Sequence, residues 1–145
     1  MSTQEELKSK VAAGKARRAS RVKAFDGEAA MLRLQNEAKL VEIEDETGLT
    51  LGIDLGVVWC PNGAMVAVRK PDFGDYETFQ LESSEAKAKD KPKLLEEYLR
   101  PCVVFPKTAL ELDSLCELYG DVKFEAANLM SHMHDVDKAS MEGKS

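Results

Sequence analysis

His132 and His134, with Met133 between them and Asp135 next in sequence, form the only cluster in the chain that resembles a metal site. They lie in a segment from Asp121 whose apolar residues recur at steps of three and four, which predicts a helix. Residues two apart on a helix point about 200° away from each other, so one helical face cannot present both imidazoles to one ion. We therefore expect two exposed histidines on a helix and no metal site.

Nucleophilic catalysis needs a cysteine or serine next to a general base. Both histidines of the chain lie after Asp121, and the sequence contains no strand-turn-helix nucleophile elbow. Cys116 could approach His132 in the folded chain, but it lies on the apolar face of a helix predicted to begin at Thr108, which favours a core thiol. No catalytic residue emerges, and we expect a protein that is not an enzyme and uses no cofactor.

Two further groups of residues could be taken for binding sites. Gly48, Gly52 and Gly56 are spaced four apart but lack the Gly-Lys-Ser/Thr sequence of a phosphate-binding loop, so strand flexibility and close packing explain them better. The acidic side chains that could bind a cation or act as acid and base are Glu42, Glu44, Asp45 and Glu46. Their dense spacing at the end of a predicted helix favours a solvated acidic face.

The composition is that of one domain with an arm. A chain of 145 residues with 43% hydrophobic residues can form a single core, and two full domains would be difficult to fit. The cysteines Cys60, Cys102 and Cys116 fit neither a disulfide framework nor a metal knuckle, so reduced and mostly buried thiols are expected. No apolar stretch is long enough to span a membrane, and the first 25 residues are too charged for a signal peptide. We expect a cytoplasmic protein without a membrane partner.

Charge is distributed unevenly along the chain. The first 25 residues carry a net charge of +5, and the remainder carries −11. The seven basic residues of this segment are Lys8, Lys10, Lys15, Arg17, Arg18, Arg21 and Lys23, against Glu5 and Glu6. These cations could neutralise phosphates, but the segment has no aromatic residue before Phe25, and the acidic remainder would repel nucleic acid. The alternatives are a solvated helical face, or a helix that docks on an acidic partner or on a second copy of the chain.

A long helix is predicted from Gln4 to about Glu46, because this segment has no proline and is rich in good helix formers. Seven of its residues recur at steps of three and four and would form one stripe: Val22, Phe25, Ala29, Leu32, Asn36, Leu40 and Ile43. Gly14 and Gly27 each weaken a helix by about 1 kcal/mol relative to alanine, so one helix and two helices are both compatible with the sequence.

A β-hairpin is predicted after Gly48, where the periodicity changes from helical to alternating. Ile53, Leu55, Val57 and Trp59 alternate with other residues, Pro61-Asn62-Gly63 has turn chemistry, and the chain from Ala64 to Arg69 is again extended in character. A two-residue loop at Asn62 and Gly63 would place Trp59 opposite Val66 and gather four apolar side chains on one face. Since an isolated hairpin is marginal in water, helices must cover that face.

Short helices are predicted for the rest of the chain. Asp72 can cap a helix whose residues Phe73, Tyr76 and Phe79 would pack on the hairpin. The segments that follow are an exposed connection from Ser83 to Lys93, a short helix over Leu94 to Leu99, a buried connection or third strand over Cys102 to Phe105, a capped helix from Thr108 to Tyr119, and a last helix from Asp121. The fold class is thus α+β and mostly helical, with one hairpin covered by short helices after a long helical arm. Its expected parts are residues 1–47 for the arm, 48–138 for the hairpin and helices, and 139–145 for a frayed tail.

Several sequence cues follow one another between about Val57 and Met130. They are Val66-Ala67-Val68-Arg69-Lys70-Pro71 followed by Tyr76 and Phe79, then Leu95 to Leu99, Arg100-Pro101-Cys102-Val103-Val104-Phe105-Pro106, and a helix that ends at Tyr119-Gly120. In their order and spacing these cues resemble the small tail assembly chaperones and related tail-module proteins of tailed bacteriophages and prophages. The long segment up to Glu46 does not match that family, and the stretch from Ser83 to Lys93 is unusually rich in lysine for it.

The resemblance implies a non-enzymatic protein that binds the tape measure protein in the host cytoplasm and keeps its long apolar helices soluble while tail-tube subunits assemble around it. The alternatives are a structural or adaptor subunit of the virion, favoured by the long arm, and a nucleic-acid-binding accessory factor that uses the basic arm. Self-association through the N-terminal helix is a further expectation. The residues expected to contact a partner are Lys15, Arg17, Arg18, Arg21, Lys23, Met31, Leu32, Leu129, Met130 and Met133, of which the last five could equally belong to the core.

Overall fold

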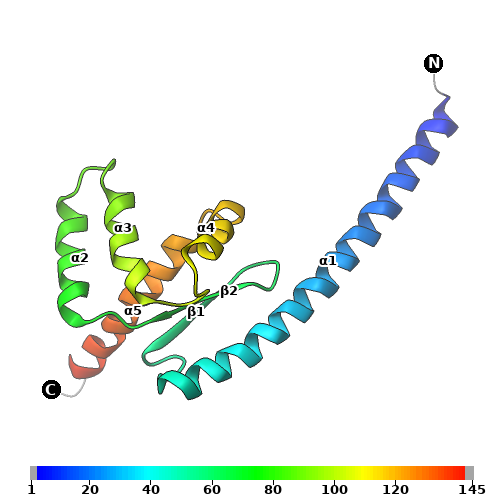
Figure 1. The fold of residues 1–145 in the computed structure, drawn as a ribbon. Coiled ribbons are helices and arrows are strands. Elements are labelled where there is room, and N and C mark those ends of the chain that lie inside the picture. The colour runs from blue at the N-terminus through cyan, green and yellow to red at the C-terminus, as the bar shows by residue number, and fades with distance from the viewer. Residues whose placement is uncertain (1–2, 143–145) are drawn as a thin grey trace.

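The computed structural model describes residues 3–142, which form a long helix, a small sheet and four shorter α-helices (Figure 1). In chain order the elements are α1 (Gln4–Thr47), β1 (Leu55–Trp59), β2 (Met65–Arg69), α2 (Phe73–Glu85), α3 (Lys91–Leu99), the 3-10 helix η1 (Arg100–Cys102), β3 (Val103–Phe105), α4 (Ala109–Leu118) and α5 (Val122–Glu142). This confirms the predicted α+β class with a long N-terminal helix. α5 is helical through Glu142, and residues 143–145 of the predicted tail lie outside the described part of the chain.

α1 is one continuous helix of 44 residues that runs through Gly14 and Gly27, so the alternative of two helices is not realised. At about 1.5 Å per residue it is about 66 Å long. A capping box begins it: the Thr3 hydroxyl accepts a hydrogen bond from the Glu6 N–H at 3.2 Å, and the Glu6 carboxylate accepts one from the Thr3 N–H at 3.3 Å. The helix ends at Gly48, whose φ of 74° is a left-handed conformation suited to glycine.

The strands form one antiparallel sheet in the order β1-β2-β3, and helices lie on both of its faces (Figure 1). Because strand residues alternate between faces, the sheet divides the apolar side chains into two clusters. One cluster joins Leu55, Met65 and Ala67 to Leu40 and Ile43 of α1. The other joins Val58, Val66 and Val68 to α3, α4 and α5. α2 packs outside this second layer, against α3 and α5.

The observed hairpin register differs by one residue from the predicted one. Trp59 lies opposite Met65 and not opposite Val66. The Cys60 N–H donates to the Ala64 carbonyl at 2.8 Å, which adds a third residue to the loop. Because a shift of one residue moves side chains to the other face, Trp59 lies on the α1 side of the sheet, and the predicted single apolar face is wrong.

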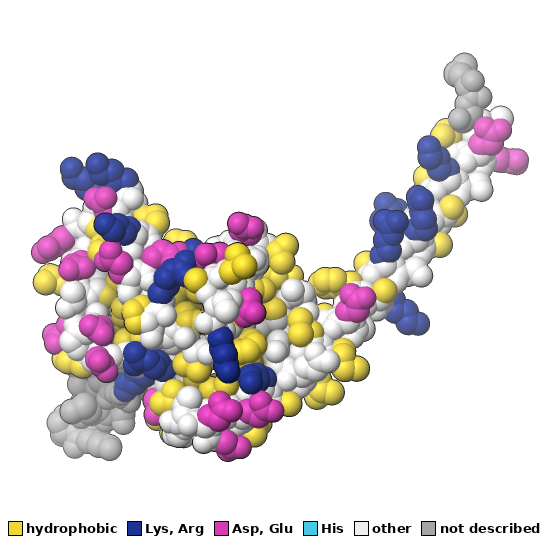
Figure 2. Space-filling model, viewed as in Figure 1, with side chains coloured by type: hydrophobic (Ala, Val, Ile, Leu, Met, Phe, Trp, Pro, Cys, Tyr) yellow, Lys and Arg dark blue, Asp and Glu magenta, His cyan; other side chains and the backbone are white. Residues whose placement is uncertain are grey.

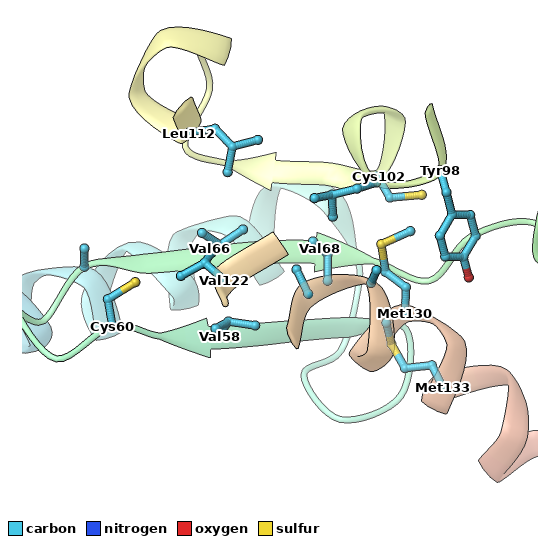
Figure 3. Close-up of a cluster of buried hydrophobic side chains, with 14 residues drawn as sticks. Val58, Cys60, Val66, Val68, Tyr98, Cys102, Leu112, Val122, Met130 and Met133 are labelled. Atoms are coloured by element: carbon cyan, nitrogen blue, oxygen red, sulfur yellow. The ribbon is translucent and has the colours of Figure 1, made fainter. Parts of the chain in front are cut away.

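The larger core lies between the sheet and helices α3, α4 and α5, as Figure 3 shows. Its fully buried side chains include Val66, Val68, Leu99 and Met130. Burying a side chain of this size stabilises a fold by about 1.5–3 kcal/mol relative to leaving it exposed. The segment predicted as a buried connection or third strand forms strand β3, which pairs with β2. Together these elements form the packed body on which α1 is mounted.

The aromatic residues of α2 pack on other helices. Phe79 stacks on Tyr98 of α3 with ring centroids 4.0 Å apart, and Tyr76 stacks on His134 of α5 with centroids 4.7 Å apart. α5 itself contacts strands β1 and β2, so it occupies the place on the sheet that the aromatic residues were expected to take. The predicted contact between these residues and the hairpin is therefore wrong.

The end of α2 and the beginning of α3 differ from the predicted boundaries, whereas the beginning of α4 agrees with its prediction. Residues 83–85 belong to α2 and residues 91–93 to α3, so the exposed connection covers only 86–90 and is shorter than predicted. The cap of α4 is confirmed: the Thr108 hydroxyl accepts a hydrogen bond from the Glu111 N–H at 3.2 Å.

Candidate functional site

The outer half of α1 extends away from the body and is the most exposed part of the described chain (Figure 1). We call residues 4–28 the arm. Every residue of the arm except Gly14 is exposed, and contact with the body begins at Ala29. Figure 2 shows basic side chains gathered along this projecting helix, separate from the mixed charges of the body.

The contact between α1 and the hairpin turn holds the arm in its direction. Asn36 is buried, and its Nδ2 donates a hydrogen bond to the Gly63 carbonyl at 3.0 Å. The turn comes so close to the helix that a Cβ on Gly63 would lie 2.2 Å from the Ala29 carbonyl oxygen. The Arg33 guanidinium lies 4.3 Å from the ring centroid of Trp59, which is a cation-π contact. These contacts fix the angle at which the arm leaves the body.

One stripe of residues at steps of three and four runs the length of α1. It consists of Leu7, Val11, Gly14, Arg18, Val22, Phe25, Ala29, Leu32, Asn36, Leu40 and Ile43. The predicted stripe is present, its inner part is buried against the body, and Ile43 is only 4% exposed. Its outer part is unoccupied: Phe25 is 46% exposed and Val22 is 58% exposed. The same helix face therefore changes from core to open surface near Ala29. We call this face the inner stripe.

Basic side chains flank the outer part of the inner stripe on both sides. At about 100° per residue, helical geometry places Lys8 and Lys15 along one edge and Lys10, Arg17 and Arg21 along the other. Arg18 lies within the stripe, and Lys23 lies away from it. An apolar centre between two basic edges suits a partner surface with apolar side chains and acidic edges.

The structure divides the residues predicted to contact a partner into two groups. The exposed group consists of Lys15, Arg17, Arg18, Arg21, Lys23 and Met31. Leu32 and Leu129 are half-buried against the core. Leu129 packs so closely on Gly56 that a Cβ on this glycine would lie 2.5 Å from the leucine side chain. Met130 and Met133 are 0% and 6% exposed. The expectation that these two methionines form an accessible surface is wrong, and the alternative that they belong to the core is confirmed.

Two features of the arm were missed in the sequence. Leu7 and Val11 continue the inner stripe beyond Val22, and the same steps of three and four would have found them. The capping box that begins α1 has a recognisable sequence signature, Thr3 followed three residues later by Glu6. Both features show that the arm is built as an ordered helix from its first turn.

The histidines form no metal site within the described residues. His132 is exposed, as expected, whereas His134 is half-buried, with its Nε2 hydrogen-bonded to the Pro71 carbonyl and its ring stacked on Tyr76. The prediction of two exposed histidines is thus wrong for His134. In the same part of the chain, no group of three or more His, Cys, Asp or Glu side chains could hold a metal ion.

The three cysteines are free thiols, with Cys60 and Cys102 buried and Cys116 half-buried. Burial is the largest cause that raises the pKa of each thiol above its ordinary value. A raised pKa keeps a thiol protonated at neutral pH, which opposes a role as nucleophile. Their placement fits the expected core thiols.

A groove of about 1030 Å³ lies between α2, α3 and α5. Its apolar lining includes Phe79, Leu95 and Phe124, and its charged residues include both Lys91 and Glu125. Because these charges have both signs, the groove lacks the single electrostatic character that distinguishes the arm. We therefore treat the arm as the main candidate site.

No protein-family model, curated protein or solved structure matches this chain. Among the helices of residues 3–142, none has both the length and the apolar character needed to cross a membrane. The geometry of the arm is therefore the main basis for a functional proposal.

Proposed function

We propose that the protein is a non-enzymatic tail assembly chaperone of a tailed bacteriophage or prophage, and that its arm binds the tape measure protein during tail assembly. The observation that carries the proposal is the open outer part of the inner stripe, which continues a face that is buried closer to the body. Covering such a face with apolar side chains removes it from water and stabilises the complex. A client with long apolar helices supplies side chains of this kind.

The charge of the arm restricts what can cover the inner stripe. Residues 4–25 carry a net charge of +5, so the arms of two copies placed face to face along their inner stripes would repel each other. The stripe is about 80° wide on the helix surface, which suits a single partner helix. A client helix with apolar residues between acidic edges satisfies both conditions.

The segments that carry the resemblance to tail assembly chaperones build the body. Val66 to Arg69 lie in β2, and Val103 to Phe105 form β3, which pairs with it. Cys102 is buried in the core below this sheet. These residues therefore hold the surface on which α1 is seated. Their structural role supports a chaperone-like body to which a client-binding arm has been added.

Co-expression with the tape measure protein of the same genome tests the proposal. We expect the two proteins to copurify and the tape measure protein to stay soluble. A variant with Val22→Asp and Phe25→Asp changes two exposed residues of the inner stripe, so it should keep its helical circular dichroism spectrum and lose the client. Leu110→Asp with Leu118→Asp is the matched control, because it places the same two charges on residues of α4 that are 77% and 69% exposed.

Two outcomes would contradict different parts of the proposal. If no tail component copurifies with the unaltered protein, the chaperone function is wrong. If the client binds equally well to the variant with Val22→Asp and Phe25→Asp, the arm is not the binding surface. In that case the groove between α2, α3 and α5 becomes the next surface to test, with Phe124→Asp at its exposed rim.

A structural or adaptor subunit of the virion is the second candidate, and the length of the arm favours it. Residues 4–28 extend about 37 Å as a helix, far enough to reach a neighbouring subunit in a particle. Mass spectrometry of purified particles separates the two functions. A chaperone should be absent from finished particles, whereas stoichiometric incorporation would establish the structural role.

A nucleic-acid-binding accessory factor is the third candidate, favoured by seven exposed basic side chains on one arm. Binding through these cations should weaken steeply as salt is raised, because it releases counterions from the phosphates. Titration of duplex DNA at two salt concentrations, with Arg17→Glu and Arg21→Glu as the altered protein, tests this. Binding that is unaffected by the salt concentration and by these substitutions would argue against this function.

A further inference from the structure

α1 has a second exposed face opposite the inner stripe. Met31, Leu34 and Val41 lie here, on the part of α1 whose other side is packed against the body. At about 100° per residue, Leu34 and Val41 point about 140–160° away from the direction of Asn36. They are 62% and 57% exposed, although both are large apolar side chains. No described residue of the body covers this face, so a second chain must do so if these residues are to be buried.

The same face continues along the arm, where its residues are small and Lys23 lies at one edge. We call it the outer face, and it consists of Ala13, Ala16, Ser20, Ala24, Gly27, Met31, Leu34, Ala38 and Val41, all of which are exposed. The large side chains occupy its C-terminal half, and small side chains occupy its N-terminal half. A second helix laid along the outer face in the opposite direction would place the large residues of each copy against the small residues of the other.

The charges of α1 are separated along its length in a way that selects this direction. Residues 4–25 contain seven basic and two acidic side chains, a net charge of +5. Residues 26–47 contain seven acidic and two basic side chains, a net charge of −5. Antiparallel pairing brings the positive half of each helix beside the negative half of the other, whereas parallel pairing brings like charges together.

We propose that two copies of the protein pair through the outer faces of their α1 helices in an antiparallel arrangement. A pair centred on Gly27 places Ser20 opposite Leu34, Ala16 opposite Ala38 and Ala13 opposite Val41. The contact from Ala13 to Val41 extends about 42 Å. Each body is packed on the other side of its own α1, so the body does not block the outer face.

This dimer does not rest on the chaperone function. The inner stripe and the outer face lie on opposite sides of α1, so pairing through the outer face leaves both inner stripes open. The dimer would therefore present two client-binding arms that project in opposite directions. Failure of client binding would leave the dimer intact, and failure of the dimer would leave client binding to a monomer.

Sedimentation equilibrium of the full chain over a range of micromolar to millimolar concentrations tests the dimer. We expect a monomer-dimer equilibrium whose dissociation constant rises as salt is raised, because salt screens the attraction between the oppositely charged halves of the two α1 helices. Leu34→Asp should raise the dissociation constant about tenfold or more, since it places a charge in the apolar contact. Leu110→Asp, on a residue of α4 that is 77% exposed, is the matched control and should leave the constant unchanged.

Three results would overturn the proposal. The first is a protein that stays monomeric at every concentration tested, and the second is a dimer whose dissociation constant Leu34→Asp leaves unchanged. A dimer that Val22→Asp and Phe25→Asp dissociate while Leu34→Asp leaves it intact would place the contact on the inner stripe. Because all of these positions are exposed, circular dichroism should show the same helix content in every variant, so a change in association cannot be attributed to misfolding.

Disulfide trapping tests the antiparallel direction. Two proteins are prepared, one with Ser20→Cys and one with Leu34→Cys, each also carrying Cys116→Ser to remove the half-buried native thiol. Mild oxidation of the mixture should join the two different variants, because these positions face each other in the pair. Parallel pairing would instead join Ser20→Cys to a second copy of itself, and that product would overturn the arrangement.

Discussion

Gly63 occupies the closest contact between the hairpin turn and α1. Its φ of 88° is left-handed, and a Cβ there would lie 2.2 Å from the Ala29 carbonyl oxygen. Gly63→Ala should therefore lower the free energy of unfolding by more than about 2 kcal/mol, through backbone strain and displacement of the helix. Urea denaturation measures this loss. Gly14→Ala is the control, because a Cβ there meets nothing within 4 Å, and it should leave the stability unchanged or slightly raised. Equal effects of the two substitutions would contradict the close contact.

The phenol of Tyr98 makes the stability of the fold depend on pH in the alkaline range. Burial raises the pKa of Tyr98 to about 12 from an ordinary value of 10.0, and its hydroxyl is hydrogen-bonded to Ser131 at 3.1 Å. Between these two values the unfolded chain loses this proton while the folded chain retains it. The contribution of Tyr98 to the free energy of unfolding is therefore fully present below pH 10 and is lost as the pH rises toward 12.

Tyr98→Phe tests this linkage. At neutral pH the substitution should cost about 0.5–1.5 kcal/mol through the lost hydrogen bond. Above pH 10 the unfolding free energy of the variant should fall less steeply with pH than that of the unaltered protein, by about 1.4 kcal/mol per pH unit. Urea denaturation at a series of alkaline pH values measures both. Tyr119→Phe, which also removes a half-buried phenol, is the control, and an identical pH dependence in all three proteins would contradict the assignment.

At the scale of elements, local periodicity was sufficient to predict α1 and the helix face on which its buried residues lie. Asn36, Leu40 and Ile43 are buried because their spacing puts them on one face and the hairpin supplies a surface for that face. The sequence also contains the signals for the cap of α4 at Thr108 and the end of α1 at Gly48. These features depend on residues a few positions apart, so they can be read without knowing the rest of the fold.

The features that sequence reasoning missed depend on contacts between distant segments. The predicted hairpin register was wrong because the loop has three residues, Pro61 to Gly63, and one residue of difference places Trp59 on the other face. The aromatic residues of α2 could pack on either the hairpin or another helix, and only the position of α5 decides between them. Met31 and Met130 were both predicted to contact a partner, yet Met31 is exposed and Met130 is fully buried. The candidate site was therefore predicted in its cations but not in its apolar residues.

A network of ion pairs joins α3, η1, α4 and α5. The Glu96 carboxylate pairs with Lys123 and with Arg100, which also contacts Asp113 at 2.7 Å. Burial by itself raises the pKa of Glu96, but the pairs with Lys123 and Arg100 outweigh it and hold this pKa below its ordinary value of 4.5. A lowered pKa means that the stabilisation is present above pH 4.5 and is lost as the pH falls through the folded-state value.

Glu96→Gln should therefore destabilise the protein at neutral pH and make its stability less sensitive to acid. The expected loss at neutral pH is about 1–2 kcal/mol, because the groups are partly exposed and the solvent screens their attraction. Thermal unfolding at pH 7 and at several values below pH 4.5 measures both effects. Glu97→Gln, on the next and exposed residue of α3, provides the comparison. A full acid sensitivity in Glu96→Gln would show that other carboxylates determine the acid response.

At the scale of the whole molecule, α1 carries two exposed surfaces that differ in their physical character. The inner stripe has an apolar centre between basic edges, and the outer face consists mainly of small and apolar side chains on a helix whose two halves have opposite net charge. The basic edges of the inner stripe repel the arm of another copy. The opposite charges of the two halves of α1 favour a second α1 that runs in the opposite direction. One helix can thus take part in client binding and in dimer formation at the same time, because the two contacts use opposite sides of it.

Hydrogen exchange along α1 can separate the two contacts in one experiment. In a monomer, amides near Leu40 and Ile43 should exchange slowly because they are packed on the body, and amides of the arm should exchange quickly because no tertiary contact protects them. Raising the protein concentration should slow exchange over residues 13–24 if the outer faces pair. Leu34→Asp should abolish that effect, and Val22→Asp with Phe25→Asp should leave it in place. Adding the tape measure protein should reverse this pattern, so that protection of the arm survives Leu34→Asp and is lost with the inner-stripe substitutions. Protection that responds identically to both sets of substitutions would mean that α1 has a single binding face, and one of the two proposals would then have to be abandoned.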